Sequence, residues 1–236
     1  MTTEPVRAVL FDAGNTLVFV DPDRMIRILD TFGVAVEPEA FAAAELDARL
    51  ALTRRLDGDA ETTGTESHVW REYFGTILQA CRVPREKLVR VGEEVRRVHA
   101  TDHLWTHVPE GTHAALAALR EAGLRLGVVS NADGRVPELL DRLGIGEQLE
   151  FVLDSGRVGV EKPDPRIFQA AVRRLGLPAG ACLFAGDLYP VDVQGARRAG
   201  LRAVLIDPWD AFGDRDVDRV LSVAEVPGYV RRLGGG

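Results

Sequence analysis

The sequence predicts an α/β fold, in which a parallel sheet flanked by helices carries an all-helical insertion after its first strand. Along residues 104–236, short apolar runs alternate with helical segments, which is typical of a parallel sheet with helices on both faces. Two of these runs, Leu124–Val129 and Leu201–Ile206, are almost continuously apolar, as buried parallel strands should be. Residues 22–103, by contrast, look helical throughout.

The first predicted strand is the apolar run Ala8–Phe11, which ends at Asp12 and is followed by turn-prone residues. Ligands of open α/β sheets bind outside the carboxyl ends of the strands, where Asp12 is expected to lie. A strand-end aspartate can act as a nucleophile, as in enzymes that form an aspartyl-phosphate. Alone, it is explained as well by a residue that caps the following turn.

The insertion begins after the turn signal Asp21-Pro22-Asp23, and its first helix ends at Gly33. We expect further helices over 41–56, after a cap at Thr65 or Ser67, and from Pro84 onward.

The core elements follow from Leu104, with a glycine after several of the predicted helices. In order we expect helix 112–122, strand 125–130, helix 135–143, strand 150–153, helix 165–175, strand 181–185, helix 191–199, strand 202–206 and a last helix near 223–233. Residues 1–19 and 104–236 therefore form the predicted core, and 20–103 the insertion. Because it enters shortly after Asp12, we expect the insertion to serve as a lid.

The composition limits the possible functions of this 236-residue chain. Its formal charge of -7 disfavours nucleic acid as a partner, and no apolar run is long enough for a membrane span. The first five residues lack the features of a signal peptide, and Cys81 and Cys182 are the only cysteines, so we expect a cytoplasmic protein without disulfides. Only two lysines occur, Lys87 and Lys162.

Polar residues that could bind an anion occur in two further stretches, one at a strand end and one in a loop. Ser130 and Asn131 end an apolar strand and can bind an anionic oxygen, although either can simply cap the next helix. Pro163 holds Lys162 extended in a loop, where its ammonium can face a phosphate or carboxylate. The alternative is a solvated loop lysine, which the scarcity of lysine disfavours.

A carboxylate pair follows Gly186. Asp187 stands at a strand end and Asp192 one turn into the next helix. With Asp12 they form a set of hard oxygen ligands suited to Mg²⁺. An N-cap role for Asp187 and a helix-dipole role for Asp192 are the alternatives.

These four stretches, in this order, resemble the motifs of the haloacid dehalogenase (HAD) superfamily, in the subgroup with a helical cap between the first and second motifs. The resemblance implies a Rossmann-like core. It also implies a nucleophile, a hydroxyl that closes the first motif, a phosphate-binding hydroxyl with an amide beside it, and a charge-neutralising lysine. These match Asp12, Thr16, Ser130, Asn131 and Lys162. The implied Mg²⁺ ligands are Asp12, Asp187, Asp192 and the main-chain carbonyl of Gly14.

One position departs from the family's phosphatases, which carry a second aspartate where this chain has Gly14. That aspartate is the general acid and base, whose loss costs about 10²- to 10⁴-fold in rate. Three explanations remain open. In the first, the protein uses leaving groups that need little protonation, or an acid from the insertion. In the second, it attacks carbon as the dehalogenases do. In the third, it is a weakly catalytic binding protein.

Three histidines, His99, His103 and His107, are candidates for an acid from the insertion. Their spacing also suggests zinc, but a surface helix explains it better, because no carboxylate or cysteine completes the set. The sequence therefore favours a Mg²⁺-dependent phosphatase of a small phosphorylated metabolite, acting through an aspartyl-phosphate, with no nucleic-acid or membrane partner.

Overall fold

The computed structural model describes residues 4–58 and 66–234. The chain divides into two compact units, Met1–Val18 with Val108–Gly236, and Phe19–His107. The junctions fall at these points because β2 (Phe19–Val20) pairs with β3 (Trp105–His107) inside the second unit.

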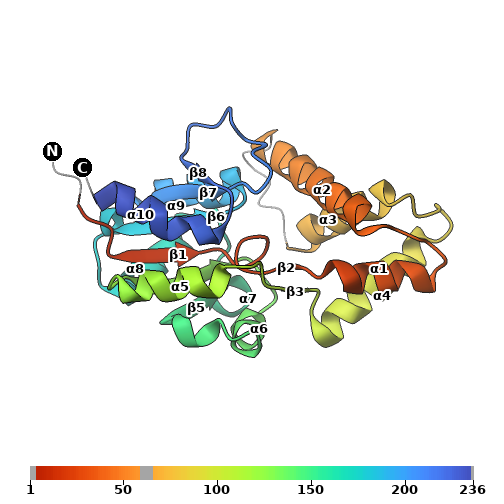
Figure 1. Cartoon of the computed structure of the whole chain (residues 1–236), viewed down its shortest axis with the longest axis horizontal. Coiled ribbons are helices and arrows are strands. Elements are labelled where there is room, and N and C mark those ends of the chain that lie inside the picture. The colour runs from red at the N-terminus through yellow and green to blue at the C-terminus, as the bar shows by residue number, and fades with distance from the viewer. Residues whose placement is uncertain (1–3, 59–65, 235–236) are drawn as a thin grey trace. The chain divides into compact units, whose positions relative to one another are not determined.

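The first unit contains a six-stranded parallel sheet in the order β5-β4-β1-β6-β7-β8 (Figure 1). The strands are β1 (Ala8–Phe11), β4 (Arg125–Ser130), β5 (Phe151–Asp154), β6 (Cys182–Gly186), β7 (Arg202–Ile206) and β8 (Arg219–Val220). The central strands β1 and β6 are buried along their whole length, as their apolar sequences predict. This confirms the predicted parallel α/β sheet.

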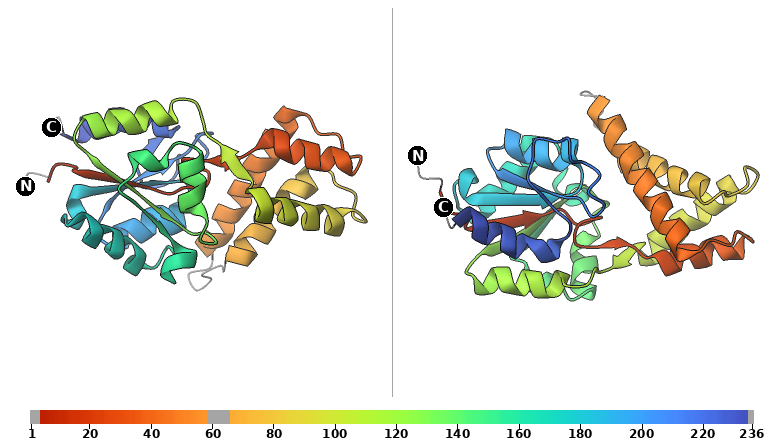
Figure 2. Two further views of the ribbon diagram at one scale, coloured as in Figure 1. Left: turned by 90° about the horizontal axis from the view of Figure 1, so that it is seen from below. Right: turned by 45° about the horizontal axis from the view of Figure 1, so that its top comes forward.

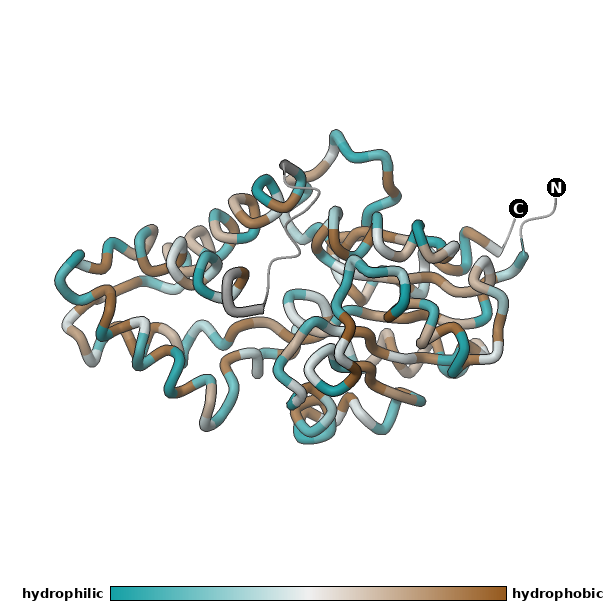
Figure 3. Tube along the Cα trace, turned by 180° about the vertical axis from the view of Figure 1, so that it is seen from behind, coloured by the Kyte–Doolittle hydropathy of each residue, from teal (hydrophilic) through white to brown (hydrophobic). Residues whose placement is uncertain are grey.

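Helices cover both faces of the sheet (Figure 2). Figure 2 shows α5 (Thr112–Glu121) and α10 (Val226–Gly234) on one side, and α8 (Pro165–Leu175) on the other. Between α8 and the sheet, Phe168 packs edge-on against Phe184, with ring centroids 5.1 Å apart. In Figure 3 the central strands are largely brown, the colour of apolar residues. The remaining helices of this unit are α6 (Val136–Arg142), α7 (Ser155–Val158) and α9 (Gln194–Arg198), with 3₁₀ turns at Gly146–Gln148, Ala179–Ala181 and Val223–Glu225.

The predicted continuous helix over 191–199 is wrong. Residues Tyr189–Val193 form a π turn, and α9 begins only at Gln194. Pro190 has no N–H to donate, and Asp192 instead donates its N–H to the Leu188 carbonyl at 2.7 Å. This irregular turn determines where the Asp192 side chain lies. Strand β8 was likewise not predicted, because its two residues are too few for a periodicity.

The second unit contains α1 (Pro22–Thr31), α2 (Pro38–Gly58), α3 (Glu66–Ala80) and α4 (Leu88–Asp102), besides the β2–β3 pair. Asp21 caps α1 by accepting the Arg24 N–H at 2.9 Å, and Pro22 takes the first helical position. Pro84 does not open the fourth helix, which starts at Leu88 after a turn. Helical structure also stops before residue 103, because His103 adopts a left-handed φ of 51° and the chain then enters β3.

A line of buried polar residues runs along α2. Glu45, Arg49 and Thr53 recur every fourth position and are all less than a tenth exposed. Glu45 accepts a hydrogen bond of 2.9 Å from the Tyr73 hydroxyl on α3. The α2–α3 contact therefore contains polar side chains besides its apolar ones.

Candidate active site

Three strand ends meet at the carboxyl edge of the sheet in the first unit. Strand β1 lies between β4 and β6, and Phe11 is opposite Val128 on one side and Ala185 on the other. Asp12, Ser130 and Asp187, which end or follow these strands, are therefore brought to the same edge.

Lys162 joins two carboxylates at this edge. Its Nζ lies 2.5 Å from Asp12 Oδ1 and 2.7 Å from Asp192 Oδ1, and all three side chains are almost completely buried. The ammonium also lies 5.3 Å from the ring centroid of Phe184. The loop lysine is thus not solvated, and a buried ion triplet connects three distant parts of the chain.

Burial and neighbouring charges together shift the pKa values of Asp12 and Lys162. Burial raises the pKa of Asp12 to about 6, with Asp192 adding to the rise and Lys162 opposing it. Burial alone would lower the pKa of Lys162, but Asp12 and Asp192 outweigh it and raise that pKa above its usual value. The lysine is therefore charged.

A carboxylate cluster at this edge meets the requirements of a hard cation. Asp12, Asp187 and Asp192 are buried, and each offers one oxygen that lies within 4.8 Å of the others. Carboxylate oxygens are the hard ligands that divalent ions such as Mg²⁺ prefer. The residues present therefore fit a bound divalent metal.

Gly186 is needed for the position of Asp192. A Cβ at residue 186 would lie 2.5 Å from the carboxyl carbon of Asp192, closer than side-chain atoms approach. Asp192 Oδ1 contacts Lys162, and Asp192 Oδ2 accepts the Leu188 N–H at 2.9 Å.

The first motif forms a tight turn. The Ala13 carbonyl accepts the N–H groups of Leu17 and Val18 at 2.9 and 3.0 Å, and Asn15 takes a φ of 54°. Thr16 is 1% exposed, and its Oγ1 has no hydrogen-bond partner within the described parts of the chain. Gly14 lies in the same turn, and its role as a carbonyl ligand stays a prediction.

The Asn131 amide pairs with the main chain of the lysine loop. Its amide nitrogen donates to the Lys162 carbonyl at 2.8 Å, and its amide oxygen accepts the Lys162 N–H at 2.7 Å. Ser130, the last residue of β4, is 4% exposed. Of these two polar residues at the end of β4, Asn131 is thus engaged with the lysine loop.

Sequence reasoning missed Asp154, which ends β5. Its carboxylate accepts the N–H groups of Gly134, Val136 and Gly156 at 2.9, 3.1 and 3.0 Å, and so holds the loop that follows Ser130 and Asn131. A signal was present, because Asp154 follows an apolar run and precedes Ser155-Gly156, much as Asp12 precedes its own turn.

The surface-helix explanation for the three histidines is wrong. His99 lies on α4, His103 is buried just beyond the end of α4, and His107 lies on β3. Backbone N–H groups donate to the Nδ1 atoms of His99 and His103, from Leu104 at 3.3 Å and Trp105 at 3.2 Å. Among the described residues, these histidines form no potential metal cluster.

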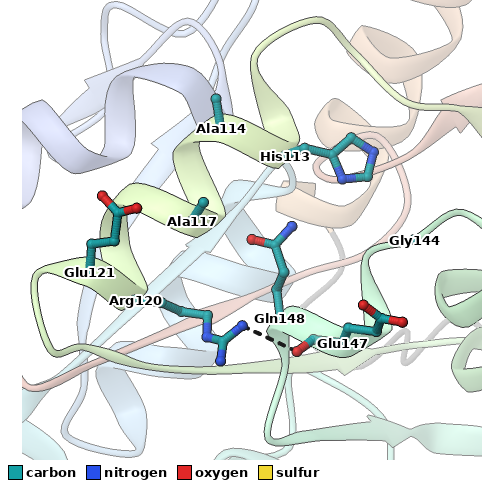
Figure 4. A pocket seen from close by; sticks show the side chains of 8 residues that line it. All are labelled: His113, Ala114, Ala117, Arg120, Glu121, Gly144, Glu147 and Gln148. Atoms are coloured by element: carbon teal, nitrogen blue, oxygen red, sulfur yellow. Dashed lines mark hydrogen bonds between the residues drawn. The ribbon is translucent and has the colours of Figure 1, made fainter.

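A surface pocket also lies on the first unit, between α5 and the segment that precedes β5 (Figure 4). His113, Arg120 and Gln148 point toward it, and Arg120 donates to the Glu147 carbonyl at 3.3 Å. It shares no residue with the carboxylate–lysine cluster. Over the described residues, no helix is both long enough and apolar enough to cross a membrane.

The chain is similar to several known proteins. A family model described as haloacid dehalogenase-like hydrolase matches residues 6–200. The chain is 33% identical over 143 residues to haloacid dehalogenase-like hydrolase domain-containing protein 3 of Mus musculus, covering 60% of this chain and 57% of that protein. It is 30% identical over 217 residues to a glyceraldehyde 3-phosphate phosphatase of Methanopyrus kandleri, covering 85% and 84%. A solved structure of the putative HAD-hydrolase YfnB from Bacillus subtilis, bound to magnesium, superimposes with a TM-score of 0.67 at 16% identity, covering 97% of this chain and all of that one.

Proposed function

Since the chain belongs to the haloacid dehalogenase-like hydrolase family and is a hydrolase, we propose that it is a Mg²⁺-dependent phosphatase of a small phosphorylated metabolite. The observation that carries this proposal is the buried lysine–carboxylate cluster, in which Lys162 contacts Asp12 beside two further carboxylates. The Methanopyrus kandleri relative is named as a phosphatase of a three-carbon phosphate, which supports this substrate class.

The proposed reaction starts at Asp12. A carboxylate oxygen of Asp12 attacks phosphorus, the bond from phosphorus to the leaving oxygen breaks, and that oxygen departs with the electron pair. Water then attacks the aspartyl-phosphate, releases inorganic phosphate and restores Asp12. The overall change is hydrolysis of one phosphate ester.

Two anions repel, so charge must be neutralised before Asp12 can approach the substrate. Lys162 supplies one fixed positive charge at 2.5 Å from Asp12. Asp12, Asp187, Asp192 and the carbonyl of Gly14 would hold Mg²⁺, which when bound supplies further positive charge and orients the phosphoryl group. We assign Ser130 to the phosphoryl oxygens and Thr16 to the closure of the first motif.

The leaving oxygen receives no proton from residue 14, because glycine has none to give. We therefore expect substrates with stable leaving groups, such as aryl and acyl phosphates, to react fastest. We also propose a cytoplasmic location, because Cys81 and Cys182 are both free thiols, and no nucleic-acid partner, because the chain is acidic.

A substrate panel with and without Mg²⁺ tests the proposal. Turnover of aryl or acyl phosphates that is lost with EDTA and with Asp12→Asn would support it. Release of halide from 2-haloacids without added metal would overturn it in favour of a dehalogenase. Binding of inorganic phosphate without turnover of any ester would overturn it in favour of a binding protein.

A further inference from the structure

The amide of Asn131 forms two hydrogen bonds to one residue of another loop. Its nitrogen donates to the Lys162 carbonyl, and its oxygen accepts the Lys162 N–H, at 2.8 and 2.7 Å. A main-chain N–H is only a donor and a carbonyl only an acceptor, so each end of the amide has one possible partner. These two hydrogen bonds join the end of β4 to the lysine loop, as a pair of backbone hydrogen bonds joins neighbouring strands.

The pairing matters because of what the side chain of Lys162 does. This side chain is 2% exposed, and its Nζ lies between Asp12 and Asp192, to which it donates at 2.5 and 2.7 Å. A lysine side chain is long and flexible, so the place of its ammonium depends on the place of its main chain. An error of about 1 Å in a reacting group can cost about 10²-fold in rate.

We propose that Asn131 is a positioning residue that fixes the main chain of Lys162, and so its ammonium between Asp12 and Asp192, rather than a ligand of the substrate. For its effect on catalysis, this inference rests on the proposed phosphatase function. Its structural part does not, because the position of the lysine can be measured without a substrate.

The chain offers an internal control for that measurement, since Lys87 and Lys162 are its only lysines. Acetic anhydride at a fixed pH acetylates accessible amines, and peptide mass spectrometry gives the rate at each lysine. Lys87 lies in the other unit and donates to the Phe32 carbonyl at 2.8 Å. In the intact chain we expect Lys162 to be the slower of the two, because it is the more deeply buried.

Two variants remove the pairing in different ways. Asn131→Ala deletes both hydrogen bonds, whereas Asn131→Asp keeps the acceptor and sets a second carboxylate oxygen against the Lys162 carbonyl. We expect acetylation of Lys162 to accelerate by about tenfold or more in each, the factor that corresponds to about 1.4 kcal/mol. Lys87 should keep its rate, which controls for the reagent. Cys182, buried in the same unit as Lys162, should stay unreactive toward a thiol reagent, which shows that this unit is folded. Ser130→Ala, one residue away, should leave the rate at Lys162 unchanged.

Kinetics with Mg²⁺ present separate positioning from substrate contact. For an aryl phosphate, the Asn131 variants should lower kcat by about 10²-fold with KM unchanged, and the Kd of inorganic phosphate should also stay unchanged. An unchanged acetylation rate at Lys162 in both variants would overturn the inference. So would a rise in KM and phosphate Kd with kcat retained, because Asn131 would then contact the substrate. Absence of phosphatase activity in the intact chain would overturn the proposed function alone, and the acetylation rates would still decide the role of Asn131.

Discussion

Gly14 stands two residues after the proposed nucleophile, in a turn whose backbone is already fixed by hydrogen bonds to Ala13. If no other group protonates the leaving oxygen, Gly14→Asp should raise kcat/KM for alkyl phosphates by about 10²-fold or more. Aryl phosphates should gain much less, since their leaving groups need less help. The measurement is the ratio of kcat/KM for alkyl phosphates to kcat/KM for aryl phosphates. A fall in kcat/KM for alkyl phosphates would contradict this expectation.

Thr16 combines deep burial with a hydroxyl that has no partner within the described regions. Thr16→Val keeps the shape and removes that hydroxyl, so unfolding stability should rise by up to about 1 kcal/mol. If Thr16 contributes to the first motif, kcat/KM should nevertheless fall by about tenfold, equivalent to about 1.4 kcal/mol.

The matched control is Thr53→Val on α2, where the hydroxyl is equally buried and also lacks a partner in the described chain. Thr53→Val should also raise the unfolding stability and should leave kcat/KM unchanged. A rate loss in both variants, or in neither, would argue against a catalytic role for Thr16.

At the scale of elements, the connection between β6 and α9 determines the geometry of the cluster. Gly186→Ala places a Cβ 2.5 Å from the Asp192 carboxyl carbon, so Asp192 must move away from Lys162. We expect kcat to fall by about 10²-fold, the usual effect of a displacement near 1 Å. Gly180→Ala, just before the same strand, meets its nearest atom at an ordinary 3.7 Å and should have little effect. Equal activity in the two variants would contradict this role of Gly186.

Helix α2 offers a test by pH. Burial raises the pKa of Glu45, and the hydrogen bond from Tyr73 and the charge of Arg49 offset this only in part. Between the ordinary and the raised pKa the folded chain binds more protons than the unfolded chain, so stability falls as pH rises through this window.

Glu45→Gln removes this dependence. The stability of the variant relative to the parent should therefore increase as the pH rises from the ordinary glutamate pKa through the raised pKa of Glu45, and then level off. Urea unfolding at several pH values measures it, with the exposed Glu39→Gln on the same helix as control. A difference that does not vary with pH would contradict the expectation.

Sequence periodicity predicted the strands and long helices of the first unit closely, because buried parallel strands and helix-ending glycines leave strong local signals. It placed Asp12, Lys162, Asp187 and Asp192 correctly at one edge, since strand ends converge there. It failed at the Tyr189–Val193 turn and at β8, β2 and β3, where structure depends on distant partners. For the same reason the hydrogen bonds of Asn131 to the lysine loop had no signature in the residues beside it.

At the scale of the whole molecule, the chain contains two compact units, each with its own apolar core. Cys81 belongs to the core cluster of the second unit, and Cys182 begins β6 in the first. Burial raises the pKa of both thiols to about 11, which keeps them unreactive while each unit is folded.

This placement means that the chain carries its own pair of denaturation reporters. A thiol reagent added along a urea gradient, followed by mass spectrometry of the two cysteine peptides, records the opening of each unit separately without any engineered label. The smaller unit should open first and expose Cys81 at lower urea, since smaller cores bury less of their surface. Coincident reaction of both thiols would instead reveal that the two units melt as one cooperative body.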